Sequence, residues 1–204
     1  MPLDPDIAAY LERAAAAGQP PYEQQSVADA REQYVRLMAA RRGADYQPAP
    51  MHSVVDRACG SAGHEIPLRV YTPPDRAAGD GGRSPGVVFL HGGGWVIGDL
   101  DTHDGVARDI ASGLGAVVVS VDYRRAPEAP FPAALEDAEA ATRWAAEHAE
   151  ELRIDAARLV VAGDSAGGGM AAVVARRARD AGGPPIAAQL LLYPVTDVTM
   201  SSDS

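Results

Sequence analysis

A five-residue segment, Gly163-Asp-Ser-Ala-Gly167, constrains the fold of this chain more than any other feature. It follows an apolar run of β type, residues 158–162, and precedes a helical run rich in Ala and Val. Glycine at both ends indicates a turn that leaves almost no room for side chains. The pattern predicts a strand, a sharp turn and a helix, with the Ser165 hydroxyl projecting from the turn. Glycine-rich turns of this kind are common, so this segment alone does not decide whether Ser165 is reactive.

A second glycine-rich segment, His91-Gly-Gly-Gly-Trp95, follows another apolar run, residues 86–90. Three consecutive glycines allow backbone N–H groups to face a ligand without intervening side chains. Such groups stabilise the negative charge that develops on a carbonyl oxygen in acyl transfer, and loss of one donor lowers the rate by about 10²–10³. The alternative is a plain glycine turn. Both segments together, in this order and each after a predicted strand, indicate a serine hydrolase.

The chain resembles the hormone-sensitive-lipase-like family of α/β-hydrolases, also called the alpha/beta hydrolase fold-3 family of bacterial esterases and lipases. Segments 91–104, 122–137, 158–169 and 192–197 carry the resemblance. The resemblance implies these site residues: the nucleophile Ser165, the oxyanion-hole amides of Gly93, Gly94 and Ala166, the loop residues His91 and Gly92, and the pocket residues Trp95 and Asp164. Trp95 could equally anchor the core. The implied substrate is a small carboxylic ester, and no cofactor or metal is implied.

The chain departs from the family pattern after Ser165. In this fold the catalytic residues follow the order Ser, Asp or Glu, then His. No histidine follows Ser165, and the resemblance places Asp197 in the loop after the sixth strand, outside the catalytic position. The resemblance implies two further strands whose loops carry the acid and the histidine. We therefore expect the C-terminal strands and helices of the fold to be missing here.

The five histidines precede Ser165, at positions 52, 64, 91, 103 and 148. A general base must approach the serine within about 3 Å. His103 is expected in the first turn of a helix capped by Thr102, and His148 near the end of a helical run. Each histidine is therefore expected to be a capping, surface or loop residue, with His91 shaping its own loop.

Three interpretations remain open at this stage. The chain is a piece of an esterase, or a pseudo-enzyme that binds esters or a partner protein without turnover, or one half of a site completed by a histidine from a second chain. DNA sequence beyond codon 204 would separate the first two.

Composition excludes several classes of partner. The formal net charge is −10, from 18 basic and 28 acidic residues, which argues against nucleic acid and anionic membranes as partners. The single cysteine, Cys59, cannot form an internal disulfide, and no Cys and His residues have metal-ligand spacing. The first residues lack the features of a signal peptide, and no apolar run approaches the ~20 residues of a membrane span. The expected compartment is the cytoplasm.

The apolar pattern predicts an α/β fold, the α/β-hydrolase fold of the family. Apolar strands alternate with helices, which implies a mostly parallel sheet covered on both faces. N-terminal cap helices are expected within residues 1–45, at 4–17 and 26–42, with Ser26 and Asp29 as a capping pair. The core is expected over residues 46–204, ending after about the sixth strand. Its expected elements are β-type runs at 53–57 and 68–71 around a turn at 61–63, a loop at 75–85, strands at 86–90, 116–121, 158–162 and 187–192, and helices at 103–113, 132–151 and 166–181.

The last predicted strand, residues 188–193, is apolar on both faces. A bare apolar strand at a sheet edge promotes self-association. We therefore expect oligomers or aggregation of this chain alone.

Overall fold

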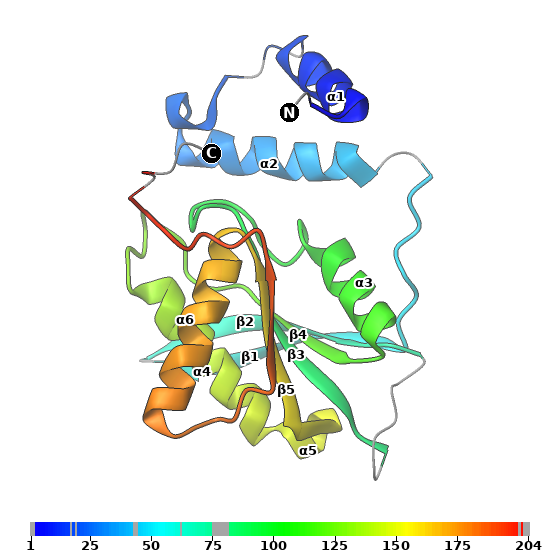
Figure 1. Cartoon of the computed structure of the whole chain (residues 1–204), viewed down its shortest axis with the longest axis vertical. Helices are drawn as coiled ribbons and strands as arrows, with labels where there is room; N and C mark the ends of the chain where they lie inside the picture. Colours follow the sequence, from blue (N-terminus) through cyan, green and yellow to red (C-terminus); the bar gives the residue numbers. More distant parts are fainter. Residues whose placement is uncertain are drawn as a thin grey trace.

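A six-stranded sheet organises the molecule, in the order β1-β2-β4-β3-β5-β6 (Figure 1). The computed structural model describes residues 3–16, 18, 20–42, 45–61, 63–74, 82–199 and 201. The strands are β1 (Ser53–Ser61), β2 (His64–Thr72), β3 (Ser84–Leu90), β4 (Val117–Val121), β5 (Ile154–Asp164) and β6 (Ala188–Leu192). β2 is antiparallel to β1 and β4, whereas β4, β3, β5 and β6 are parallel to one another. The predicted mostly parallel sheet is confirmed.

Helices cover both faces of this sheet and its carboxyl edge. The described helices are α1 (Pro5–Ala16), α2 (Val27–Arg42), α3 (Asp104–Leu114), α4 (Ala133–Glu147), α5 (Ala149–Leu152) and α6 (Ala166–Ala181), with a 3₁₀ turn η1 (Tyr22–Gln24), and α1 lies beyond α2, away from the sheet (Figure 1). Helix α3 lies on one face, α4 and α6 lie on the other, and α2 runs across the carboxyl ends of β3 and β5 (Figure 1). Among the described helices, none combines the length and apolar character needed to cross a membrane.

The structure corrects two helix predictions and confirms a third. The run 132–151 is two helices, because His148 leaves helical geometry with ψ 15° and ends α4. Thr102 does not cap α3, because its hydroxyl donates to the Asp99 carbonyl and accepts the Asp99 N–H, both at 2.9 Å. By contrast, the Asp29 N–H donates to the Ser26 hydroxyl at 3.2 Å, so Ser26 caps α2 as predicted.

The β1–β2 hairpin is longer than its sequence pattern indicates. Its register runs from Ser53 opposite Thr72 to Ser61 opposite His64, beyond the predicted runs 53–57 and 68–71. Cross-strand hydrogen bonds carry the strand through residues of low β-propensity such as Gly60. Residue 62 of the predicted turn and residues 75–81 of the predicted loop lie outside the described residues.

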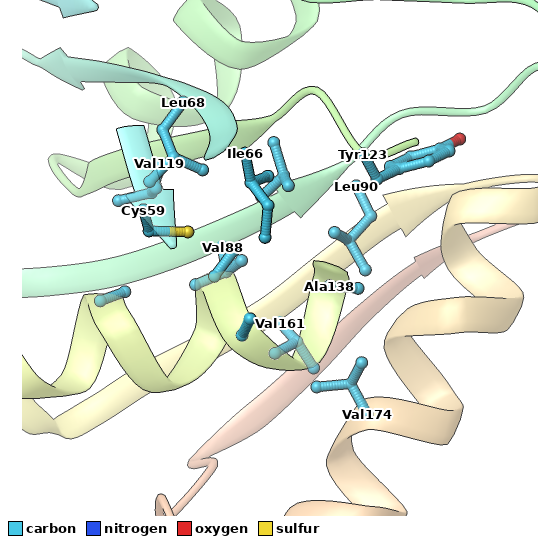
Figure 2. Packing of buried hydrophobic residues seen from close by; sticks show 14 of the residues in the cluster. Cys59, Ile66, Leu68, Val88, Leu90, Val119, Tyr123, Ala138, Val161 and Val174 are labelled. Carbon is cyan, nitrogen blue, oxygen red and sulfur yellow. The ribbon is translucent and has the colours of Figure 1, made fainter. Parts of the chain in front are cut away.

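The core has two layers, one on each side of the sheet. Alternate residues of β3 separate them, because successive side chains of a strand point to opposite faces. Val88 and Leu90 pack with α4 and α6, whereas Val87 and Phe89 pack with α3. Figure 2 shows the first layer, with Val88 and Leu90 near Ala138 of α4. Both layers are buried, which explains the continuously apolar strands of the sequence.

Cys59 lies within this first layer and is 5% exposed. Burial raises the pKa of its thiol to about 11. A thiol with a raised pKa is a poor nucleophile at neutral pH, so Cys59 is a core residue.

Candidate active site

The loop after β3 presents backbone amides beside the end of β5. The Gly92 N–H donates to Oδ1 of Asp164 at 2.8 Å. The Gly93 carbonyl accepts from Val96 at 3.1 Å and from Ile97 at 2.9 Å, which closes a turn. Within the described part of the chain, the N–H groups of Gly93 and Gly94 have no hydrogen-bond acceptor.

Two glycines of this loop are required by space and backbone conformation. A Cβ on Gly92 would lie 2.2 Å from Oδ2 of Asp164. Gly93 has φ +124°, and a Cβ there would lie 2.1 Å from the Ile97 carbonyl oxygen. No other residue type fits either position without displacing the loop.

Ser165 lies at the junction of β5 and α6, as the sequence predicts. Its backbone has φ +51° and ψ −117°, a conformation that non-glycine residues rarely adopt. A Cβ on Gly163 would lie 2.4 Å from the Gly167 carbonyl carbon, and one on Gly167 would lie 1.9 Å from the Leu90 carbonyl oxygen. Both glycines therefore allow β5, α6 and the end of β3 to meet.

The backbone of Ser165 is held while its side chain is free. Its N–H donates to the Leu192 carbonyl at 2.9 Å, and its carbonyl accepts from Gly169 and Val195 at 3.0 Å each. The half-buried hydroxyl makes no hydrogen bond to any described residue. The N–H of Ala166, in the first turn of α6, has no partner within the helix, as is usual for that position.

Ser165 opens on a cavity of about 590 Å³ between the glycine loop and α2. Gly93, Gly94 and Asp164 line the cavity on one side, and Ala30 and Tyr34 of α2 line it on the other. This cavity brings the predicted nucleophile and two predicted oxyanion donors together.

These features match those of a known family. The family described as alpha/beta hydrolase fold matches residues 87–204. The chain belongs to this family. Within it, the chain falls in the hormone-sensitive-lipase-like branch that its motifs resemble.

Among curated relatives, the chain is 55% identical to Esterase LipI of Mycobacterium tuberculosis over 155 residues, which are 74% of this chain and 48% of that protein. It is 38% identical to an ethyl acetate hydrolase of Pseudomonas putida, covering 98% of this chain and 63% of that one. Among solved structures, a hyperthermophilic esterase from the archaeon Pyrobaculum calidifontis superposes with a TM-score of 0.87 at 42% identity, over 98% of this chain and 62% of that one. The chain spans about half the length of the first curated relatives it matches.

In this α/β-hydrolase chain, Trp95 and Asp164 lie in different cavities. Asp164 lines the cavity of Ser165, whereas Trp95 lines a second, strongly apolar cavity of about 610 Å³ with Leu135 and Met170. Trp95 also packs against the core layer under α4 and α6. Gly94 borders both cavities, so they meet at the glycine loop.

Asp164 links the loop to a buried histidine. Burial by itself raises the pKa of this carboxyl, but the contact with His103 and the Gly92 amide outweigh burial and hold the pKa below its ordinary value. Nε2 of His103 lies 3.6 Å from Oδ1 of Asp164. His103 is 2% exposed and is the N-cap residue of α3, one position before the first turn in which it was expected.

His91 has the structural place expected of it. Its ring is fully buried, stacks on Tyr123 at 4.2 Å and donates from Nδ1 to the Gly92 carbonyl at 2.9 Å. Burial, followed by the charge of His103, lowers the pKa of His91 to about 3. The ring is therefore neutral at pH 7.

The other three histidines lie outside the cavity of Ser165. His148 donates to the Trp144 carbonyl at 2.9 Å, and His64 lies 2.9 Å from Oδ1 of Asp137. His52 is exposed before β1. None of the five lines the cavity of Ser165. No group of residues able to hold a metal ion occurs in the described part of the chain.

Sequence analysis missed two side chains of α2. Tyr34 lines the cavity, where burial and then the charge of Asp164 raise its pKa to about 12. Arg31 donates to the Val96 carbonyl at 2.9 Å. No sequence signal marks either residue, because α2 is far from the glycine loop along the chain.

Proposed function

We propose that the chain provides the nucleophile and oxyanion hole of a serine-type carboxylic ester hydrolase. The observation that supports this most is the unbonded Ser165 hydroxyl at a strained junction, on the same cavity as the free amides of Gly93 and Gly94. We further propose that residues 1–45 form a cap and residues 46–204 a hydrolase core. The named activities of the relatives, which include ethyl acetate hydrolysis, support small carboxylic esters as substrates.

The chemistry would proceed in two steps. The Ser165 oxygen attacks the ester carbonyl carbon as its proton passes to a base, and the former carbonyl oxygen becomes an anion. The N–H groups of Gly93, Gly94 and Ala166 would bind that anion, aided by the positive end of the α6 dipole. Collapse of the intermediate expels the protonated alcohol, and water then releases the carboxylic acid and regenerates the serine.

The proton acceptor is the open part of this proposal. None of the five histidines lines the cavity of Ser165, so we assign the base to a group outside the described residues. Without one, the chain would bind esters with little turnover, which is the alternative function. The absence of a neighbouring histidine is the observation that favours this alternative.

Hydrolysis of p-nitrophenyl butyrate tests the proposal, with Ser165→Ala as the key variant and Ser112→Ala, an exposed serine of α3, as the matched control. Loss of the base in a comparable enzyme lowers kcat about 10⁶-fold. Because the serine and its base act as a unit, we expect this chain alone to hydrolyse the ester slowly or not at all, with little further loss in either Ser165→Ala or Ser112→Ala.

Covalent labelling by a fluorophosphonate probe, followed by intact mass, reports directly on Ser165. Probe labelling that survives Ser165→Ala would contradict the assigned nucleophile. Rates of ordinary enzymatic size, about 1–10³ s⁻¹, that Ser165→Ala abolishes and Ser112→Ala leaves unchanged would support the hydrolase and show that a base exists within the chain. Saturable binding of an ester analogue without Ser165-dependent turnover would support the alternative.

A further inference from the structure

Arg31 of helix α2 joins three segments that are distant in the sequence. Its Nε donates to the Val96 carbonyl at 2.9 Å, and its Nη2 donates to the Ala126 carbonyl at 3.2 Å. Its Nη1 and Nη2 also donate to the two carboxylate oxygens of Glu128, each at 2.8 Å. A planar guanidinium can make this set of bonds at once, whereas a lysine ammonium cannot reproduce its fixed geometry.

The Val96 carbonyl belongs to the turn that carries Gly93 and Gly94. The neighbouring Trp95 carbonyl accepts from the Ala126 N–H at 2.9 Å, and the Gly98 carbonyl accepts from the Arg125 guanidinium. The carbonyls of Trp95, Val96 and Gly98 are thus held by groups outside the loop. The N–H groups of its two glycines, which border the cavity, remain free.

Helix α2 also forms the opposite wall of that cavity. Ala30 and Tyr34, one residue before and three residues after Arg31, line it across from Gly93 and Gly94. A ligand in the cavity would therefore lie between α2 and the glycine loop. Arg31 is a bridge between these two walls.

The ion pair between Arg31 and Glu128 contributes little to the stability of the contact between α2 and the glycine loop. The Arg31 side chain is 28% exposed and that of Glu128 is 61% exposed, and exposed ion pairs contribute little to stability. The Arg31 hydrogen bonds to the Val96 and Ala126 carbonyls are part-buried. Charge-assisted bonds of this kind are stronger than neutral ones, and Glu128 orients the guanidinium for them.

We propose that Arg31 is a positioning residue that sets the separation between α2 and the loop 93–98 and keeps the Gly93 and Gly94 amides directed to the cavity. Its effect on reactivity rests on the proposed function, whereas its effect on the loop does not.

Hydrogen exchange measured by mass spectrometry tests the loop directly. The variants are Arg31→Ala and Arg31→Lys, with Arg36→Ala as the matched control, because Arg36 lies on the same helix in an exposed ion pair with Glu32. We expect both Arg31 variants to raise exchange in peptides covering 93–98 and 126–128 by about tenfold or more, since each loses charge-assisted bonds. Arg36→Ala should leave both segments unchanged.

Exchange in 93–98 that stays at the wild-type rate in both Arg31 variants would overturn the proposal. If Arg31→Ala does not fold, Arg31→Lys decides, because it keeps the charge opposite Glu128 while losing the planar fork.

Kinetics of Ser165 labelling by a fluorophosphonate probe test the consequence for the amides. We expect the maximal labelling rate of Arg31→Lys to fall about tenfold or more with a smaller change in the half-saturating concentration, because one lost oxyanion donor costs about 10²–10³. A change in the half-saturating probe concentration with no change in the maximal labelling rate would contradict a role of Arg31 in directing the amides. If wild-type Ser165 is not labelled, this chain alone lacks an activated nucleophile, which favours the ester-binding alternative, and hydrogen exchange still decides the role of Arg31.

Discussion

The backbone of Ser165 is strained, and its neighbours maintain the strain. A non-glycine residue in a sparsely populated conformation costs about 1–3 kcal/mol. Both backbone polar groups of Ser165 are bonded, to Leu192 of β6 and to Gly169 and Val195. The conformation is therefore set by tertiary contacts around the turn as well as by the turn itself.

The glycines around Ser165 have different roles from glycines elsewhere, which yields a prediction. Gly167→Ala would place a methyl group 1.9 Å from the Leu90 carbonyl oxygen, whereas a Cβ on Gly113, in α3, would meet no atom within 4 Å. We expect Gly167→Ala to lower the free energy of unfolding by about 1–3 kcal/mol or more. Gly113→Ala should raise it by about 0.5–1 kcal/mol.

Thermal unfolding followed by circular dichroism checks both variants. Equal melting temperatures for the two would contradict the packing that we describe between α6 and the end of β3.

The buried His91 predicts a pH dependence of stability. Its pKa is about 3 in the folded protein against 6.5 for the free side chain. Between these values the unfolded chain binds a proton that the folded protein does not, so the free energy of unfolding falls as the pH falls. The slope contributed by His91 is at most about 1.4 kcal/mol per pH unit, and its full stabilisation is present only above pH 6.5.

Urea unfolding at pH 7, 6 and 5 measures that slope. His91→Gln should be less stable than the wild type at pH 7 and should have a shallower slope. His52→Gln, at an exposed position, should keep the wild-type slope. A slope in His91→Gln as steep as in the wild type would show that other groups cause the acid sensitivity.

At the scale of elements, one carboxylate joins α4 to the sheet. Asp137 of α4 is fully buried and accepts from the Arg124 N–H at 2.8 Å, from Nη2 of Arg124 at 2.8 Å, and from Nε2 of His64 at 2.9 Å. It therefore links α4 to the connection after β4 and to the start of β2. Its neighbour Glu136 is half exposed and makes a 3.4 Å ion pair with Arg124.

Two substitutions compare how much Asp137 and Glu136 contribute to stability. Asp137→Asn leaves buried donors without acceptors, and we expect it to lower the free energy of unfolding by about 1–3 kcal/mol. Glu136→Gln should change it by about 0.5 kcal/mol or less, as for other surface pairs. Urea titration measures both. A larger effect of Glu136→Gln would contradict the linking role of Asp137.

At the scale of the whole molecule, β6 is an exposed edge. Among the described strands it pairs with β5 alone. Leu190, Leu191 and Leu192 are half-buried, and Tyr193 just beyond them is 77% exposed. Unpaired apolar edges template association with other chains.

We expect concentration-dependent association of this chain in sedimentation velocity. Leu192→Lys places a charge on the edge and should shift the distribution toward monomer. Leu114→Lys, at an exposed position at the end of α3, should not. A wild-type chain that stays monomeric at all concentrations would contradict self-association through the edge of β6.

The features predicted correctly from sequence are those that local sterics and periodicity control. The glycine spacing around Ser165 specifies its junction, because only glycine fits there. The apolar runs of β3 and β5 predict buried strands, because strands that are covered on both faces are continuously apolar. The break at His148 and the full length of the β1–β2 hairpin were not predicted, because competing packing and cross-strand bonding set them.

By itself, the sequence determined a strand–turn–helix with Ser165 at its turn, a glycine loop that can present backbone amides, and a mostly parallel sheet covered on both faces. Only the tertiary structure decided that His103 lies beside Asp164, that Trp95 faces a separate cavity, and that Arg31 bridges α2 to the glycine loop. The physical reason is separation along the chain. Contacts between distant residues depend on strand order and on where a helix crosses the sheet edge, and no local pattern encodes either.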